Sequence, residues 1–341
     1  MKKIFFLTVV YCSLLISCKN NSDGKKLSYD GKILTEQLTQ REFDYSKAKE
    51  ELNRERTDSR IPFTMNFYGC LGKPVLKVEG NNDVYVMLDS GSTRNWFYYS
   101  LLEKINVTED DFIQKVVEYI KQNELELIKN HSSEKEVAQY LKNEWSNYNL
   151  NYLASVSFGD ISLRYDPNVN ETFDGVLGAE FLLNYDRVTI DFINQYIILN
   201  DEKLDGAALK MYQSPNDEFD IYFEYRGQPE FGMIDTGNYG FTPRHNFGDR
   251  NQQYDINDYS NYGYGYKDKV PITPRVMYSY NDIKIGEIIY NNMNGAYSTI
   301  KGSGFNKGAQ SHMMKLNGLG NVFFYNHIIQ FDFVDMQFII K

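Results

Sequence analysis

The sequence predicts a mostly β protein with two similar lobes and a helical insertion in the first lobe. One pattern behind this prediction is an apolar strand that leads into an acid, a hydroxyl residue and a glycine, found at Asp89 and again at Asp235. A second pattern, Leu-Gly followed by an aromatic turn and two apolar strands, comes after each acid. Tyrosine and phenylalanine are also abundant, with 28 and 22 residues, which favours strands.

The two copies keep the same order and nearly the same spacing. In the first half the acid Asp89 and the Leu-Gly glycine Gly178 are 89 residues apart. In the second half Asp235 and Gly320 are 85 residues apart. Such duplicated order indicates an internal repeat, in which each copy forms one lobe.

The remaining sequence divides around these lobes. Residues 1–17 are typical of a secretory signal peptide, because two lysines precede an apolar run too short to span a bilayer. Residues 18–60 are polar and charged and predict a flexible tether that includes a short helix near Tyr45 to Arg54. We place the first lobe at residues 61–205 and the second at residues 206–341. Helical periodicity and a capping box predict the insertion at about residues 101–149.

The signal ends in Leu15-Ile16-Ser17-Cys18, which resembles the bacterial lipobox. The resemblance implies that Cys18 carries a lipid that anchors the protein to a membrane of the bacterial cell envelope, with its body facing the periplasm or the cell surface. An ordinary signal peptide with an incidental cysteine is the alternative. Only Cys70 follows Cys18, so the mature chain is expected to have no internal disulfide and no cysteine metal site.

Composition and motif content exclude several classes of function. The net charge of −10 argues against nucleic acid as a partner, because phosphate binding requires a basic face. The four histidines lack metal-ligand spacing, and no Gly-x-Ser-x-Gly nucleophile elbow is present. We therefore expect a monomer without a metal or cofactor.

The duplicated acids predict acid–base chemistry. Acids at equivalent positions of two lobes meet at the pseudo-twofold axis if the lobes pack face to face. Two like charges a few ångströms apart do not both ionise, so the pair holds one proton. The ionised acid then takes a proton from a bound water, which attacks a peptide bond, and the protonated acid donates to the carbonyl oxygen. The alternative is two unrelated acids that cap turns after strands.

Asp89-Ser90-Gly91-Ser92 and Asp235-Thr236-Gly237 resemble the Asp-Thr/Ser-Gly loops of aspartic proteases. Phe173-Asp174-Gly175-Val176-Leu177-Gly178 is similar to the segment that packs under the first loop in pepsins, and the short hairpins are similar to those of bacterial retropepsin-like domains. The resemblance covers about residues 61–100 and 150–341. It implies two acid-protease-like β-barrel lobes and an endopeptidase whose substrate is a peptide or protein.

The resemblance also assigns roles by position. It implies that Asp89 and Asp235 are the catalytic pair. Five neighbours are expected to support them, through cross-lobe hydrogen bonds (Ser90, Thr236), through backbone N–H groups (Gly91, Gly237) and through a bond to the outer oxygen of Asp89 (Ser92).

Several features depart from the family pattern. Asn238 stands where Ser or Thr is usual, and Gly318 stands where the motif is normally apolar. No glycine occurs between Gly91 and Gly159, so the glycine-tipped flap of the first lobe is missing or rebuilt. The stretch Tyr262-Gly263-Tyr264-Gly265 is a candidate flap in the second lobe, or else a solvent loop. These departures leave a second hypothesis open, a catalytically inactive protease-like lipoprotein that binds peptides or envelope components.

Overall fold

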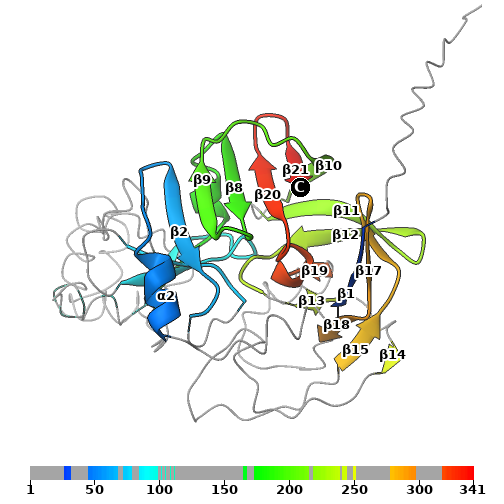
Figure 1. The fold of residues 1–341 in the computed structure, drawn as a ribbon, viewed down its shortest axis with the longest axis horizontal. Helices are drawn as coiled ribbons and strands as arrows, with labels where there is room; N and C mark the ends of the chain where they lie inside the picture. Colours follow the sequence, from blue (N-terminus) through cyan, green and yellow to red (C-terminus); the bar gives the residue numbers. More distant parts are fainter. Residues whose placement is uncertain are drawn as a thin grey trace, which may run out of the picture.

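The computed structural model describes the chain in separate segments. These are residues 27–31, 45–67, 72–78, 84–98, 164–166, 173–214, 218–238, 240–243, 249–250, 277–296 and 317–341, with residues 101, 104, 108 and 111. The expected signal peptide with Cys18, nearly all of the expected insertion at 101–149 and the candidate flap at 262–265 lie outside the described residues. The described part is mostly β (Figure 1), which confirms that part of the predicted fold class.

An antiparallel sheet lies at the centre of the fold and takes strands from both halves of the chain (Figure 1). In pairing order its strands are β2 (Arg60–Thr64), β9 (Tyr196–Leu199), β8 (Arg187–Asp191), β20 (Ile328–Asp332), β21 (Gln337–Ile340) and β10 (Ala207–Gln213). The halves meet at β8 and β20, where Thr189 lies opposite Gln330. Gln330 Nε2 donates to Thr189 Oγ1 at 2.9 Å, and both residues are buried. A buried polar pair of this kind fixes the register of the two strands.

The two hairpins of this sheet, β8–β9 and β20–β21, have the same turn. In each, the acid that ends the first strand accepts backbone N–H groups of the turn, at 2.8 Å for Asp191 and at 3.1 and 3.2 Å for Asp332. A residue near the end of each turn has positive φ, 58° at Gln195 and 51° at Met336. The Asp-Phe pairs that end the two first strands, Asp191-Phe192 and Asp332-Phe333, therefore begin turns whose acid satisfies backbone donors.

A second sheet in the first half leads to Asp89. In pairing order it consists of β2, β3 (Val75–Lys77), β4 (Tyr85–Leu88), β7 (Gly175–Leu177), β5 (Trp96–Tyr98) and β6 (Arg164–Asp166). β4 and β7 are parallel, and the Asp89 N–H continues their ladder by donating to the Leu177 carbonyl at 2.8 Å. Asp89 thus lies directly at the end of the paired strand β4.

The second half has the same arrangement around Asp235. β11 (Phe219–Tyr225) and β12 (Gln228–Ile234) form a hairpin, and β12 runs parallel to β19 (Asn317–Leu319). The Asp235 N–H donates to the Leu319 carbonyl at 3.0 Å. The sheet also includes β13 (Phe241–Thr242), β18 (Met293–Ala296), β15 (Met277–Tyr280), β14 (Asp249–Arg250), β16 (Ile283–Ile285) and β17 (Ile288–Asn291). A shared origin of the two halves stays a prediction.

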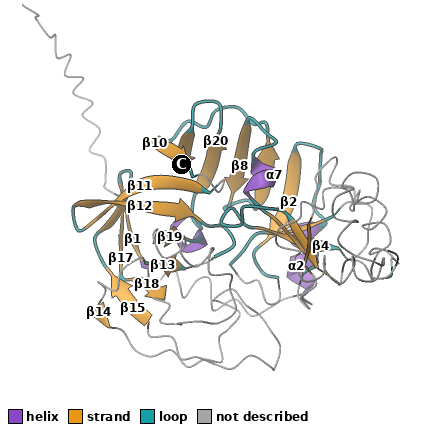
Figure 2. Ribbon diagram, turned by 180° about the vertical axis from the view of Figure 1, so that it is seen from behind, coloured by secondary structure: helices purple, strands orange, loops and turns teal. Residues whose placement is uncertain are grey.

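Two segments of the range 18–60, predicted as a tether, fold onto the body. β1 (Ser28–Asp30) pairs in parallel with β17, and Tyr29 stacks on Tyr290 with ring centroids 5.6 Å apart. α2 (Tyr45–Leu52) lies beside β2, as both views show (Figures 1 and 2). Arg54, just after α2, donates to the carbonyls of Phe63, Asn194 and Gln195 at 2.6–3.1 Å. The expected short helix corresponds to α2, and both segments make specific side-chain contacts with the body.

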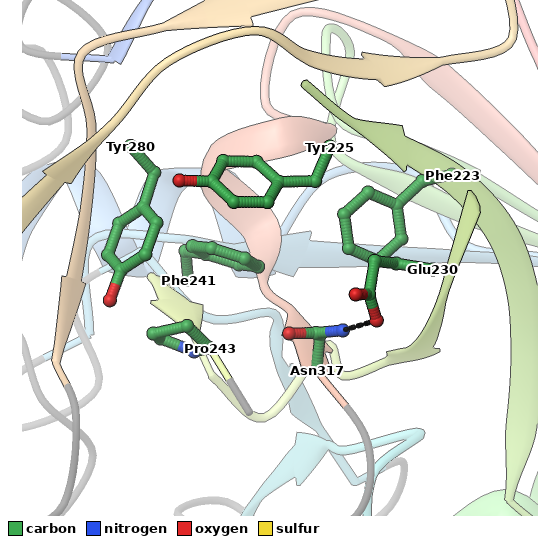
Figure 3. Close-up of a pocket in the computed structure, with 7 residues that line it drawn as sticks. All are labelled: Phe223, Tyr225, Glu230, Phe241, Pro243, Tyr280 and Asn317. Carbon is green, nitrogen blue, oxygen red and sulfur yellow. Dashed lines mark hydrogen bonds between the residues drawn. The ribbon is translucent and has the colours of Figure 1, made fainter. Parts of the chain in front are cut away.

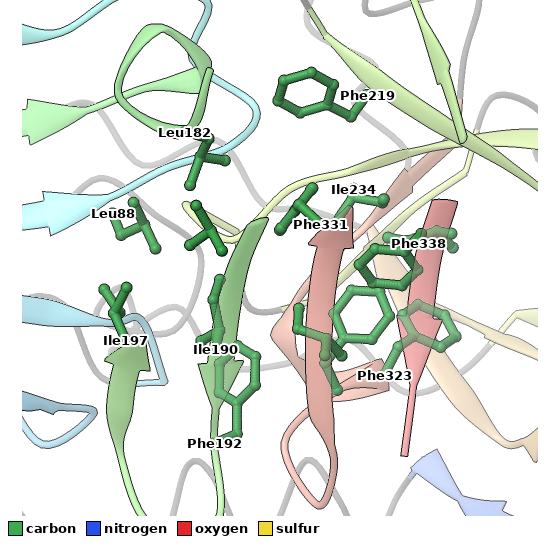
Figure 4. Packing of buried hydrophobic residues seen from close by; sticks show 14 of the residues in the cluster. Leu88, Leu182, Ile190, Phe192, Ile197, Phe219, Ile234, Phe323, Phe331 and Phe338 are labelled. Carbon is green, nitrogen blue, oxygen red and sulfur yellow. The ribbon is translucent and has the colours of Figure 1, made fainter. Parts of the chain in front are cut away.

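The apolar core packs directly behind the two acids. Figure 4 shows Ile190 and Phe331 of the central sheet in the same cluster as Leu88 and Ile234, the residues that precede the acids. All four side chains are buried. Burial of the preceding residue fixes each strand end, so the acid that follows has a defined position. No helix in the described residues is long and apolar enough to cross a membrane.

Candidate active site

The loops that follow β4 and β12 have equivalent backbone hydrogen bonds. The Ser92 N–H donates to the Asp89 carbonyl at 3.0 Å, and the Asn238 N–H donates to the Asp235 carbonyl at 3.2 Å. The carbonyls of Ser92 and Asn238 each accept an N–H from the start of a short helix, at 2.7 and 2.8 Å. Each acid loop is thus fastened to the short helix that follows its Leu-Gly. These helices are α7 (Ala179–Leu182) and η3 (Asn321–Phe323).

Ser90 and Thr236 join the two loops by four hydrogen bonds. The Ser90 N–H donates to Thr236 Oγ1 at 2.9 Å, and the Thr236 N–H donates to Ser90 Oγ at 3.0 Å. Ser90 Oγ donates to the Ile234 carbonyl at 2.7 Å, and Thr236 Oγ1 donates to the Leu88 carbonyl at 3.1 Å. Both hydroxyl residues are fully buried, so these bonds form in a low dielectric and hold the loops rigidly.

This junction brings Asp89 and Asp235 together. Their side chains hydrogen-bond each other, and each faces the glycine of the opposite loop. A Cβ on Gly91 would stand 2.6 Å from Asp235 Cγ, and a Cβ on Gly237 would overlap the Asp89 carboxyl. Glycine is therefore required at both positions, because any side chain would displace the opposite acid.

The surroundings raise the pKa of Asp235 more than the pKa of Asp89. Burial raises the pKa of Asp89, whereas the Lys73 charge, the hydrogen bond from Asp235 and the N–H groups of Gly91 and Ser92 lower it. Burial also raises the pKa of Asp235, and here the Asp89 charge and the hydrogen bond to Asp89 raise it further, well above the ordinary value. Asp89 is consequently the member of the pair that ionises more readily. Asp89 is also the more exposed of the two.

Ser92 supports Asp89 through its backbone rather than through its hydroxyl, which corrects the expected bond to the outer oxygen. The N–H groups of Gly91 and Ser92 donate to Asp89 Oδ1 at 3.0 and 3.1 Å. The Ser92 hydroxyl donates to the Arg94 carbonyl at 2.9 Å and accepts from Trp96 Nε1 at 3.2 Å. The hydroxyl is therefore used to shape the loop.

Two residues beside the acids were not identified from the sequence. Asn321 Nδ2 donates to the carbonyls of Thr236 and Gly72, at 2.7 and 2.9 Å, and so ties the second acid loop to the turn before β3. Lys73 follows in that turn, is 2% exposed, and lowers the pKa of both acids by its charge. Asn321 comes directly after the second Leu-Gly, a position that could have indicated it. Nothing in the sequence distinguishes Lys73 from other lysines.

A pocket lies in the second half of the chain. It is mostly aromatic, and Figure 3 shows its lining residues, Phe223, Tyr225, Glu230, Phe241, Pro243, Tyr280 and Asn317. Asn317 Nδ2 lies 3.4 Å from Glu230 Oε2, within this lining. Among the described residues, no group of His, Cys, Asp or Glu side chains could hold a metal ion.

Comparison with known proteins gives weak similarities of fold. No protein-family model and no curated protein sequence matches the chain. The structure is similar to a retropepsin-like aspartic protease from Rickettsia conorii, with 13% identity and a TM-score of 0.25 over 40% of this chain and 91% of that one. It is also similar to Basic 7S globulin from soybean, with 9% identity and a TM-score of 0.25 over 52% of this chain. The match spans 59% of the soybean protein.

Proposed function

We propose that the chain is an aspartic endopeptidase that hydrolyses peptide bonds with Asp89, Asp235 and an activated water. The observation that carries this proposal is the contact between the two carboxyls at the junction of the acid loops. The reciprocal bonds of Ser90 and Thr236 support it, because they keep both acids fixed without a bound substrate.

The charge distribution gives each acid a separate task. Asp89, the ionised member, accepts a proton from a water bound between the carboxyls, while Asp235 donates its proton to the substrate carbonyl oxygen. The water oxygen attacks the carbonyl carbon and forms a tetrahedral diol. Asp89 then passes its proton to the amine nitrogen, the C–N bond breaks, and Asp235 recovers a proton from a diol hydroxyl. The acids return to their starting state with no covalent intermediate.

The test uses Asp89→Asn and Asp235→Asn, which remove one ionisable group each with little change in shape. Wild type is expected to cleave a peptide library within about pH 3–7, the range in which paired carboxyls titrate. Each variant should lose about 100-fold or more in kcat/KM, the smallest share usually carried by acid–base catalysis. Asp58→Asn, at an exposed acid, is the matched control and should retain full activity. Wild-type cleavage rates in either active-site variant contradict the proposal.

A peptide-binding protein without catalysis is the second candidate, and Asn238 favours it. Its side chain donates to Thr242 Oγ1 at 2.8 Å and accepts from the Gly240 N–H at 3.2 Å. The side chain in the place of the family's Ser or Thr is thus engaged within its own loop. If wild type cleaves nothing at any pH but binds a statine-containing peptide by calorimetry, this candidate replaces the enzyme.

We also propose that the protein is exported and anchored to a membrane of the bacterial cell envelope through Cys18. The support is the lipobox-like ending of the apolar N-terminal run. Cys18→Ala should move the protein from the membrane fraction to the soluble fraction and abolish incorporation of radiolabelled palmitate. Equal labelling and fractionation of variant and wild type would contradict the anchor.

A further inference from the structure

Lys73 lies in a turn that is fastened to both acid loops. The carbonyl of the preceding residue accepts from Asn321 Nδ2 at 2.9 Å, and the same nitrogen donates to the Thr236 carbonyl at 2.7 Å. The carbonyl of the following residue, Pro74, accepts the Leu88 N–H at 2.9 Å. Thr236 comes directly after one acid and Leu88 directly before the other. The backbone of Lys73 is therefore held in a fixed position relative to the pair.

The charge of Lys73 is buried and needs compensation. The residue is 2% exposed, and burying an ammonium group is costly unless an opposite charge stabilises it. Its charge acts on Asp89 and on Asp235, and lowers the pKa of each. The acid pair, with its single negative charge, is thus the group that compensates the ammonium.

We propose that Lys73 is a positioning residue of the site, a fixed positive charge that the turn before β3 holds beside the acid pair and that favours the singly ionised pair. The kinetic consequence rests on the proposed function, whereas the effect on titration does not. With one proton on the acids and one on the amine, the buried trio is electrically neutral, which reduces the cost of burying it.

The kinetic test compares pH profiles of kcat/KM for wild type and Lys73→Met, which keeps an unbranched apolar side chain without the charge. Both ionisations of the pair should then require a higher pH, so the whole bell-shaped profile should move to higher pH. The variant should be slower than wild type on the acidic side and faster on the alkaline side. A purely structural role would instead lower activity at every pH, so a uniform loss overturns the proposal.

Two further variants complete the set. Lys73→Arg keeps the charge and should keep the wild-type profile, even if the larger group lowers the rate. Lys77→Met removes a partly exposed lysine from the adjoining strand and should change neither rate nor profile. If Lys77→Met moves the profile as far as Lys73→Met does, a general change in net charge explains the result and the proposal is wrong.

A titration separates this inference from the proposed function. In protein labelled with ¹³C at aspartate carboxyls, Lys73→Met should move both ionisations of the pair to higher pH. A shift in a protein without peptidase activity would uphold the inference and refute the enzyme, and an unchanged titration would overturn the inference alone. If Lys73→Met does not fold, the ¹⁵N chemical shift of the Lys73 side chain can be followed against pH in ¹⁵N-lysine-labelled wild type. It should change over the pH range in which the acids ionise, and this change should be absent in Asp89→Asn. If the Lys73 chemical shift does not change as the acids ionise, the inference is wrong.

Discussion

Removal of the Thr236 hydroxyl should destabilise the protein far more than the loss of one exposed hydrogen bond would. Thr236→Val keeps the shape of the side chain but leaves the Ser90 N–H without its acceptor at 2.9 Å and the Leu88 carbonyl without its donor at 3.1 Å. The site is fully buried, so water does not replace these partners. A buried backbone group without a partner costs about 1–3 kcal/mol, so we expect the free energy of unfolding to fall by about 2–4 kcal/mol.

The measurement is urea unfolding followed by tryptophan fluorescence, together with kcat/KM. Thr236→Ser keeps the hydroxyl and should recover most of the stability, whereas Thr57→Val, at an exposed hydroxyl, should change it by less than about 0.5 kcal/mol. Activity of Thr236→Val should fall through kcat, because the variant loosens the alignment of the acids rather than a substrate contact. If Thr236→Val is as stable as Thr57→Val, the junction between the loops does not exist as described.

Three other changes test separate features. Gly91→Ala should lower kcat/KM by about 100-fold or more, because the added Cβ would stand 2.6 Å from Asp235 Cγ and displace that acid. Steady-state kinetics measure the loss, and circular dichroism checks that the variant folds. The pKa of Asp235 is raised in the folded state, so its protonation contributes stability at acidic pH that is lost as pH rises through the raised pKa. The free energy of unfolding in urea should therefore decline with pH in wild type and decline less in Asp235→Asn. If the two proteins give parallel curves of unfolding free energy against pH, the prediction is wrong. Arg54→Ala should cost about 1.5–3 kcal/mol and speed amide exchange in α2, whereas Glu50→Ala on the exposed face of that helix should do neither.

The acid loops and their hairpins could be predicted from the sequence because their signals are local. The strand into Asp235 pairs in antiparallel register with β11, the strand before it. The turn between them, Arg226 and Gly227, has φ of 51° and 72°, the paired positive values that a two-residue hairpin turn requires. Glycine adopts positive φ readily, so a glycine between two strand-like segments predicts such a turn from the sequence alone.

The contacts of the N-terminal segments could not be predicted, because they are long-range. Arg54 is held by carbonyls of Asn194 and Gln195, which lie 140 and 141 residues further along the chain. A charged segment has the same composition whether its side chains bind water or carbonyls far away in the sequence. Composition therefore favoured a tether. Lys73 was missed for the same reason, since its effect comes from two acids on different loops.

The two unusual residues of the second half form one arrangement. Ser92 accepts a hydrogen bond from Trp96, four residues later, and Asn238 makes the equivalent contact by donating to Thr242, also four residues later. Thr242 packs against Gly318, where a Cβ would stand 3.2 Å from the Thr242 Cβ. An apolar side chain at position 318 would therefore press on the residue that Asn238 binds. The glycine and the asparagine are therefore linked through Thr242.

The surroundings of the two acids bear on which acid carries the proton. Burial raises the pKa of Asp89, but the Lys73 charge and the N–H groups of Gly91 and Ser92, at 3.0 and 3.1 Å from Oδ1, lower it. Burial, the Asp89 charge and the hydrogen bond to Asp89 all raise the pKa of Asp235. The carboxyl with the lower pKa ionises more readily. In the proposed mechanism the acid of the first half therefore activates the water, and the acid of the second half donates the proton.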